Sequence, residues 1–219
     1  MNKGAIFDVD GTLLDSMPVW ENAPDRFLEG LGIAAEPGLF EIMLRMSLDE
    51  GAAYLKSAYK LDMTYQEIKD GVLGVIRDFY FYQAQPKPGA REFLQELKER
   101  HIPMYIATSS NREHIRAAFE RLKIDQYFDG MITCEEAGAG KSDPRIFLMA
   151  AERMGMQPAD IFVFDDVINA VRSANRAGFV TVGVYDPSSS ADNDAMRKES
   201  WIYIHSLENR ERFFKAAGL

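Results

Sequence analysis

The chain has little cysteine, no long hydrophobic run and no excess of positive charge. Cys134 is the only cysteine among 219 residues, which excludes an intramolecular disulfide and makes a thiolate metal site implausible. No apolar run could span a bilayer, and strand-like sequence begins within a few residues of Met1, so we expect no signal peptide and a cytoplasmic location. The 34 acidic residues exceed the 25 basic ones and give a net charge of −9, which argues against a nucleic-acid partner.

What the chain does have is a pair of carboxylates at the end of its first apolar run. Residues 5–7 are typical of a short buried parallel strand, and Asp8 and Asp10 follow it, just before a Gly-Thr turn. In open α/β sheets, ligands bind beyond the carboxyl ends of the strands. Two acids there repel each other, so a hard divalent cation such as Mg²⁺ is their natural partner. An Asp-rich turn that binds nothing is the alternative.

Beyond Pro86, strand-like runs alternate with amphipathic helical patterns. This alternation predicts an α/β fold with a doubly wound, Rossmann-like parallel sheet. The sequence 187–190 is interpreted as a polar loop without a further role. The expected strands are 103–107, 131–134, 161–164 and 180–184, and the expected helices are 88–100, 113–122, 144–154 and 170–177.

Residues 15–85 interrupt this alternation with helical patterns only. They contain six basic and twelve acidic residues, so they carry much of the negative charge. We therefore expect an α/β core of residues 1–14 and 86–219, with a small all-helical cap, 15–85, inserted after the first strand like a lid over the strand ends. The expected cap helices are 19–31, 39–46, 48–59 and 65–82.

Three later segments carry groups suited to phosphate or metal. Thr108 and Ser109 follow a predicted strand, where a hydroxyl and helix-facing amides suit a phosphate oxygen; an N-cap at Ser110 or Asn111 explains the same residues without a ligand.

Lys141 lies in a Gly-rich loop before a helix; it could meet developing negative charge, although a lone loop lysine is commonly exposed. Asp165 and Asp166 repeat the opening pattern of paired acids at a strand end, and their mutual repulsion favours a metal-binding function.

With these four motifs in order, the chain resembles the haloacid dehalogenase-like superfamily. Within it, the resemblance is to the capped sugar-phosphate phosphatases and the β-phosphoglucomutase-like members, and it covers the whole chain. The family motifs fall on Asp8, Asp10, Gly11 and Thr12, then on Thr108, on Lys141, and on Asp165 with Asp166.

The resemblance implies a two-step phosphoryl transfer. Asp8 is the expected nucleophile, which forms an aspartyl-phosphate, and Asp10 the general acid and then base. The expected phosphate-binding residues are Thr108, Ser109 and Lys141. Mg²⁺ is the expected cofactor, held by Asp8, the main-chain carbonyl of Asp10 and Asp166, with Asp165 nearby or acting through water.

Departures from the family pattern bear on the reaction. Val167 and Ala170 replace a serine and a glycine of the fourth motif, and Ser142 replaces a proline of the third. Trp20 and Asp49 stand where β-phosphoglucomutase-like members have a cap histidine and a cap arginine, which favours hydrolysis over mutase chemistry.

The cap segment Arg45, Met46 and Ser47 resembles the loop that selects the substrate, with Arg45 at a position commonly held by glycine. Pairing of Arg45 with the helix dipole or with Glu41 is an equal alternative.

These observations predict a Mg²⁺-dependent phosphatase for a small phosphorylated metabolite, a sugar or polyol phosphate. A sugar-phosphate mutase is the first alternative and a non-catalytic phospho-acceptor or binding protein the second. Dehalogenation is disfavoured because that chemistry does not need Asp10. We expect no nucleic-acid or membrane partner, and a monomer or weak dimer.

Overall fold

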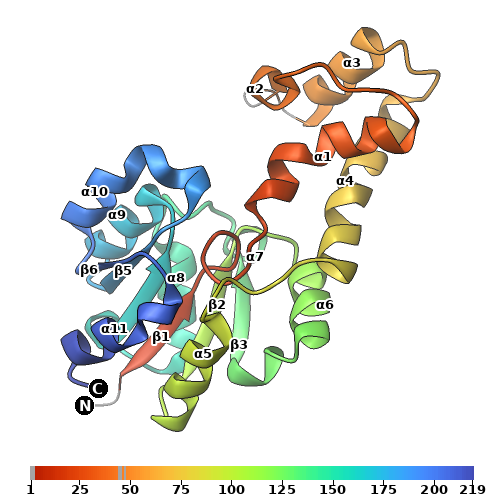
Figure 1. Ribbon diagram of the computed structural model, residues 1–219. Coiled ribbons are helices and arrows are strands. Elements are labelled where there is room, and N and C mark those ends of the chain that lie inside the picture. The colour runs from red at the N-terminus through yellow and green to blue at the C-terminus, as the bar shows by residue number, and fades with distance from the viewer. Residues whose placement is uncertain (1–2, 44–45, 47) are drawn as a thin grey trace. The chain divides into compact units, whose positions relative to one another are not determined.

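The computed structural model describes residues 3–43, 46 and 48–219. The chain divides into two compact units (Figure 1). The larger unit comprises Met1–Asp15 and Ala84–Leu219, and the smaller comprises Ser16–Gln83.

The larger unit is built on a six-stranded sheet in the order β3-β2-β1-β4-β5-β6, with every neighbouring pair parallel. The predicted α/β class with a doubly wound parallel sheet is confirmed. β1 lies between β2 and β4, so the first strand is central and its carboxyl end adjoins two others. The strands are β1 (Gly4–Phe7), β2 (Met104–Thr108), β3 (Gly130–Thr133), β4 (Ile161–Asp165), β5 (Val180–Val184) and β6 (Ile202–Ile204).

Successive side chains of β1 enter two different cores, because side chains alternate across a strand. Ile6 belongs to an apolar cluster that includes Ile146 and Phe147. Phe7 points to the other face, where its ring stacks on Phe164 at a centroid distance of 4.3 Å and meets Phe93 edge-on at 6.3 Å. Both faces of the strand are therefore buried, as parallel sheets require.

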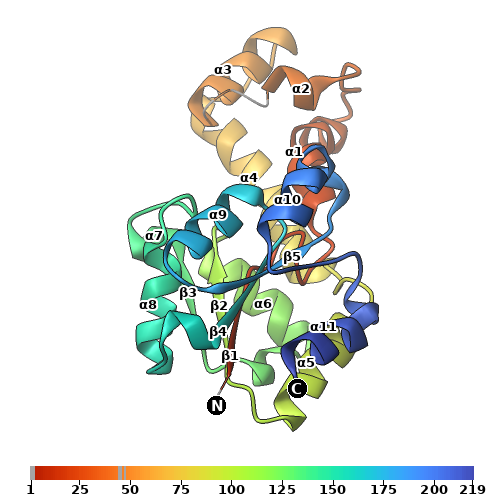
Figure 2. The same cartoon turned by 90° about the vertical axis from the view of Figure 1, so that its left-hand side faces the viewer.

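Helices cover both faces of this sheet. Figure 2 shows α8 and α9 on one side and α5 and α11 on the other. The α-helices of this unit are α5 (Ala90–Glu99), α6 (Arg112–Leu122), α7 (Cys134–Ala137), α8 (Arg145–Met154), α9 (Ile168–Arg176), α10 (Asn193–Glu199) and α11 (Arg210–Ala217). The 3₁₀ helices are η1 (Asp125–Tyr127), η2 (Pro158–Asp160), η3 (Pro187–Asp192) and η4 (Leu207–Asn209).

Most predicted boundaries lie within two residues of the observed ones, and the third strand and the helix expected over 39–46 show two of the differences. The third strand ends at Thr133, one residue early, because Thr133 accepts a hydrogen bond from the backbone N–H of Glu136 and caps α7, which starts at Cys134. The helix expected over 39–46 ends at Met43, and Met46 lies in a bend. α7, β6 and the last two helices were not predicted, since their apolar residues form only short runs.

The smaller unit contains four α-helices within its described residues. α4 is fixed at its start by a capping box between Thr64 and Glu67. Trp20 donates a hydrogen bond from Nε1 to the hydroxyl of Tyr80 over 3.0 Å, which ties the first helix to the last. The helices are α1 (Met17–Gly30), α2 (Leu39–Met43), α3 (Leu48–Ala58) and α4 (Tyr65–Tyr82).

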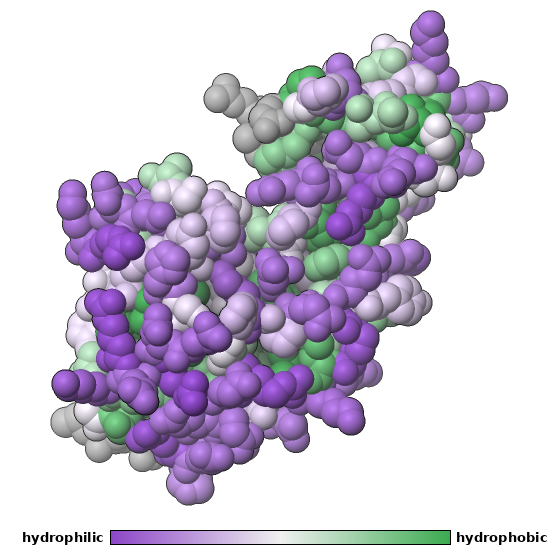
Figure 3. Space-filling view, in the orientation of Figure 1, coloured by the Kyte–Doolittle hydropathy of each residue, from purple (hydrophilic) through white to green (hydrophobic). Residues whose placement is uncertain are grey.

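The surface of the chain is mainly hydrophilic, with hydrophobic areas on both units. In the view of Figure 3, hydrophilic residues cover most of the larger unit and leave small hydrophobic areas, and hydrophobic areas are also visible among the hydrophilic residues of the helical unit. Among the described residues, none of the helices combines the length and the hydropathy needed to cross a membrane.

Candidate active site

Three carboxylates meet where β1 and β4 end. The register pairs Phe7 with Phe164, so the residues that follow them, Asp8 and Asp165, lie side by side. The N–H of Asp8 donates to the carbonyl of Phe164 over 2.9 Å and continues the strand pairing into the site. Asp8, Asp165 and Asp166 are buried, and each offers an oxygen atom within 4.8 Å of the others.

Lys141 brings a positive charge into this cluster. Its Nζ donates to Oδ1 of Asp8 in a short contact and to Oδ2 of Asp165 over 2.9 Å. Its side chain is only 11% exposed, so the loop lysine is not the solvent-exposed residue that its local sequence allows. The buried hydroxyl of Ser173 on α9 donates to the carbonyl of Lys141 and anchors the loop.

Asp166 is held by hydroxyl groups. Thr12 donates to its Oδ1 over 3.2 Å, and Ser189 donates to its Oδ2 over 3.1 Å. Gly11, with φ +79°, leaves no room for a side chain, because a Cβ there would lie 2.6 Å from Oδ2 of Asp166. The Gly-Thr turn after the first strand therefore packs directly against Asp166, the second of the two acids at the end of β4.

Burial and like charges oppose ionisation of this cluster. Burial, only partly offset by Lys141, and the neighbouring Asp8 raise the pKa of Asp165 to about 6. Burial, followed by Asp8 and Asp165, also raises the pKa of Asp166 well above its usual value. Burial disfavours the charge on Lys141, but Asp165 and Asp8 outweigh it and raise the lysine pKa. One cation faces three acids, so the site is short of positive charge.

Asp10 and the end of β2 are linked by Ser110. The hydroxyl of Ser110 donates to Oδ2 of Asp10 over 2.5 Å, and its N–H donates to Oγ1 of the fully buried Thr108 over 3.0 Å. Asn111 is the N-cap of α6, since its side chain accepts from the N–H of Glu113. Ser110 is therefore not the cap; it is a buried contact of Asp10 that sequence analysis did not assign.

Ser109 lies apart from these contacts. Its side chain is exposed, and its Oγ is 3.3 Å from Sγ of Cys134. Of the two hydroxyl residues expected to bind phosphate, Thr108 is buried beside Ser110, whereas the Ser109 hydroxyl contacts α7. Its role in phosphate binding stays a prediction.

The loop after β5 is a part of the site that the sequence did not indicate. Its interpretation as a polar loop without a role is wrong, because Ser189 contacts Asp166. Lys87, just before α5, is a second missed residue: it forms an ion pair with Asp186 over 2.8 Å and also bonds the carbonyl of Gly11. Lysine and serine residues are common on surfaces, and no local pattern marks these.

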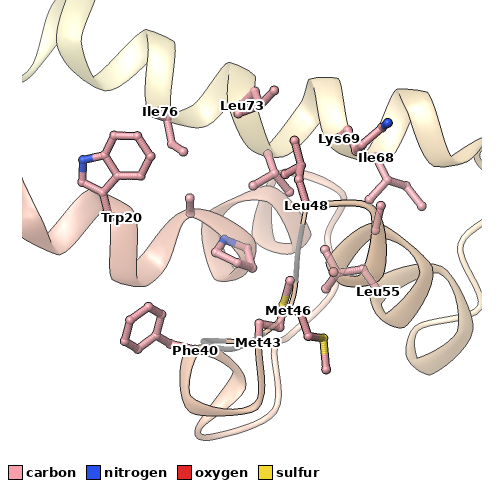
Figure 4. Close-up of a pocket in the computed structure, with 15 residues that line it drawn as sticks. Trp20, Phe40, Met43, Met46, Leu48, Leu55, Ile68, Lys69, Leu73 and Ile76 are labelled. Atoms are coloured by element: carbon pink, nitrogen blue, oxygen red, sulfur yellow. The ribbon is translucent and has the colours of Figure 1, made fainter. Parts of the chain in front are cut away.

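The helical unit contains an apolar cavity of about 460 Å³ (Figure 4). Met46, predicted to select the substrate, lines it, whereas Arg45 and Ser47 lie outside the described residues. Trp20 also lines the cavity, and Asp49 pairs with the cavity residue Lys69 over 2.6 Å. The residues lining it are Trp20, Ala23, Pro24, Phe40, Met43, Met46, Leu48, Gly51, Ala52, Leu55, Ile68, Lys69, Val72, Leu73 and Ile76.

The acidic cluster fits a divalent cation. Carboxylate oxygens are hard ligands of the kind that Mg²⁺ takes, and Asp8, Asp165 and Asp166 present them close together in a buried position. A dication there would neutralise the repulsion that raises the pKa values of Asp165 and Asp166.

Comparison with known proteins gives a consistent result. A family model for haloacid dehalogenase-like hydrolases matches residues 2–178. A phosphorylated carbohydrates phosphatase of Thermotoga maritima is 29% identical over 80% of this chain and 82% of its own. A Drosophila melanogaster protein named "Probable pseudouridine-5'-phosphatase" is 30% identical over 85% of this chain and 83% of its own.

Hexitol phosphatase A of Escherichia coli (strain K12) is 28% identical over 94% of this chain and 92% of its own. Among solved structures, a Thermotoga maritima protein assigned as a beta-phosphoglucomutase superposes with a TM-score of 0.83 at 26% identity, covering 97% of this chain and 98% of that one. The family match spans most of the sequence and includes all four motifs at the sheet edge. The chain is an enzyme that belongs to the haloacid dehalogenase-like hydrolases.

Proposed function

We propose that the protein is a phosphatase that hydrolyses a small phosphorylated sugar or polyol through an aspartyl-phosphate. The observation that carries this proposal is the carboxylate of Asp8 at the end of the central strand, in contact with Lys141 and beside two further buried acids. A buried carboxylate next to a cation and a candidate metal site is suited to attack an electrophilic phosphorus atom.

In the first step, an Oδ atom of Asp8 forms a bond to phosphorus as the bond to the substrate alcohol breaks. Asp10 donates its proton to the leaving oxygen. In the second step, Asp10 takes a proton from water, the water oxygen bonds to phosphorus, and the bond to Asp8 breaks to release phosphate. The contact between Ser110 and Asp10 supports this role, because it orients the carboxyl group.

Thr108 and Lys141 would bind the oxygens of the transferring phosphoryl group. Asp8 and Asp166, together with the main-chain carbonyl of Asp10, would hold Mg²⁺, with Asp165 close by. When bound, Mg²⁺ would neutralise charge on the phosphoryl oxygens. Asp165 is better placed to orient Lys141 than to act in the reaction, since Oδ2 accepts from that lysine and Oδ1 from the N–H of Val167 over 3.0 Å.

The substrate class is supported by the relatives. One of them is named as a phosphorylated carbohydrates phosphatase and another as a hexitol phosphatase, and both align over four fifths of this chain or more. We infer that Ser16–Gln83 is the cap domain that selects the leaving alcohol, as its place after the first strand suggests.

A panel of sugar, polyol and nucleotide phosphates, assayed for phosphate release with and without Mg²⁺, tests the proposal. We expect Mg²⁺-dependent release with a preference for sugar or polyol phosphates. Rapid acid quench and peptide mass spectrometry should find the transferred phosphoryl group on Asp8. Phosphorylation of another residue, or equal turnover with chelator, would contradict the mechanism.

A sugar-phosphate mutase is the second candidate, favoured by the similarity to the Thermotoga maritima structure assigned as a beta-phosphoglucomutase. Trp20 and Asp49 argue against it, since neither offers the basic group expected at those cap positions. Incubation with a hexose 1-phosphate separates the two: a mutase yields an isomeric hexose phosphate, and a phosphatase yields free sugar and phosphate.

A further inference from the structure

Two loops that are far apart in the sequence hold the carboxylate of Asp166. Thr12, in the turn after β1, donates to Oδ1, and Ser189, in η3 after β5, donates to Oδ2. The Gly11 turn also lies against this carboxylate, as the 2.6 Å approach of a Cβ built there indicates. The orientation of Asp166 therefore depends on how these two loops are held together.

Lys87 connects the same two loops. Its Nζ donates to the carbonyl of Gly11 over 2.6 Å, to the carbonyl of Tyr185 over 2.7 Å and to Oδ2 of Asp186 over 2.8 Å. An ammonium group has three N–H donors, so all of them are used. The side chains of Lys87 and Asp186 are 15% and 4% exposed, which makes the pair mostly buried.

Asp186 extends this connection to the η3 turn. Its Oδ1 accepts from the N–H of Ser188 over 3.0 Å and from the hydroxyl of Ser188 over 2.6 Å, so it caps the turn that carries Ser189. The ion pair with Lys87 thus fixes the point from which Ser189 reaches Asp166.

We propose that Lys87 is a positioning residue that, with Asp186, clamps the Gly11–Thr12 turn to the Ser189 loop and so orients Asp166 for a divalent cation. This inference rests on the proposed function, because it takes Asp166 as a metal ligand. Groups that hydrogen-bond to a metal-binding carboxylate restrict its orientation, and their loss weakens metal affinity.

If Lys87 and Asp186 affected Mg²⁺ binding only through their charges, substitutions of the two residues would change the affinity in opposite directions. Lys87→Met removes a positive charge and leaves Asp186 ionised, so through-space attraction alone would strengthen Mg²⁺ binding. Asp186→Asn removes a negative charge and would weaken it. The clamp predicts weaker binding in both variants, since either substitution breaks the same connection.

Isothermal titration of Mg²⁺ into the full chain distinguishes these cases without measuring activity. We expect Lys87→Met and Asp186→Asn to weaken binding about tenfold or more. Ser189→Ala should weaken it about threefold through the loss of one hydrogen bond. Ser190→Ala, at an exposed serine of the same turn, is the matched control and should bind as the wild type does.

Tighter Mg²⁺ binding by Lys87→Met, or unchanged binding by Ser189→Ala, would overturn the clamp. If Lys87→Met does not fold, Lys87→Arg replaces it: the charge is kept but the ammonium geometry is lost, so the clamp predicts weaker binding and charge alone predicts no change. Absence of Mg²⁺ binding by the wild type would instead refute the metal site of the proposed function, and the clamp with it.

Discussion

The hydroxyl of Ser110 donates a hydrogen bond to Oδ2 of Asp10 over 2.5 Å, between residues 100 positions apart. The contact joins the loop after β2 to the loop after β1, and Ser110 is buried. In a hydrolysis that needs one group to give and then take a proton, such a contact restricts the carboxyl group to one orientation.

Removal of this hydroxyl should slow catalysis more than it weakens substrate binding. We expect Ser110→Ala to lower kcat about tenfold with a smaller change in KM. Asp10→Asn should lower kcat further than Ser110→Ala does, because it should impair both formation and hydrolysis of the aspartyl-phosphate. Single-turnover kinetics with an acid quench measures the two steps separately, and wild-type rates for both in Asp10→Asn would remove Asp10 from this role.

Replacement of the proposed nucleophile should abolish turnover and leave the fold intact. Asp8→Asn changes almost no volume, but an amide does not attack phosphorus, so we expect phosphate release to fall by about a thousandfold or more. Asp15→Asn changes an exposed residue of the same segment and is the matched control. Circular dichroism and thermal melting verify folding; a folded Asp8→Asn with normal turnover would show that another residue is the nucleophile.

The metal-free protein should lose stability as the pH rises. Asp165 has a folded pKa of about 6, and that of Asp166 is also raised, so the folded state binds these protons more tightly than the unfolded chain. Their favourable contribution is complete below the unfolded pKa near 3.8 and is lost as the pH passes through the folded values. Mg²⁺ should oppose this loss and raise Tm by about 5 °C or more at pH 7.5.

Thermal melts at pH 5 and pH 7.5, in chelator and in Mg²⁺, measure this effect. Asp166→Asn should make the chelated protein less sensitive to pH, because it removes one of the two titrating acids. A chelated wild type that gains stability from pH 5 to pH 7.5 as strongly as the Mg²⁺-loaded protein does would contradict the prediction.

The two acids after β4 should differ in their effect on metal affinity. Oδ2 of Asp165 accepts from the ammonium of Lys141, and Oδ1 accepts from the N–H of Val167. Both oxygens of Asp166 also accept hydrogen bonds, but from the uncharged hydroxyl groups of Thr12 and Ser189, which do not compete with a cation. We expect Asp166→Ala to weaken Mg²⁺ binding about tenfold more than Asp165→Ala does. Titration calorimetry gives both constants, and the reverse order would exchange the two roles.

Arg45 carries the prediction for substrate selection, and it rests on the sequence alone. If its guanidinium contacts the substrate, Arg45→Ala should raise KM for the preferred phosphorylated metabolite about tenfold. A small aryl phosphate, which needs only the core residues, should be affected far less. Equal effects on the two substrates would assign Arg45 to the surface and leave selection to other cap residues.

The sequence by itself determined the fold class and the four motifs, three of which follow predicted strands and one of which lies in a Gly-rich loop. Apolar runs such as residues 161–164 are local signals, and a parallel sheet collects the residues that follow them at one edge. Asp8, Asp165 and Asp166 are therefore predicted to lie at the same edge of the sheet. The resemblance to a family added the expected division of chemical roles among them.

Only the tertiary structure decided which residues support those acids. Lys87, Ser110 and Ser189 lie in loops whose local sequence is compatible with ordinary exposed turns, and their partners are far along the chain. Two distant loops can form a hydrogen bond only if the order of the strands in the sheet brings them together. The periodicity of hydropathy along the sequence predicts strands but does not predict their order. Lys141, in the Gly-rich loop, is likewise buried in ion pairs with Asp8 and Asp165. These two carboxylates lie at the ends of β1 and β4, which are close together because the two strands are neighbours in the sheet.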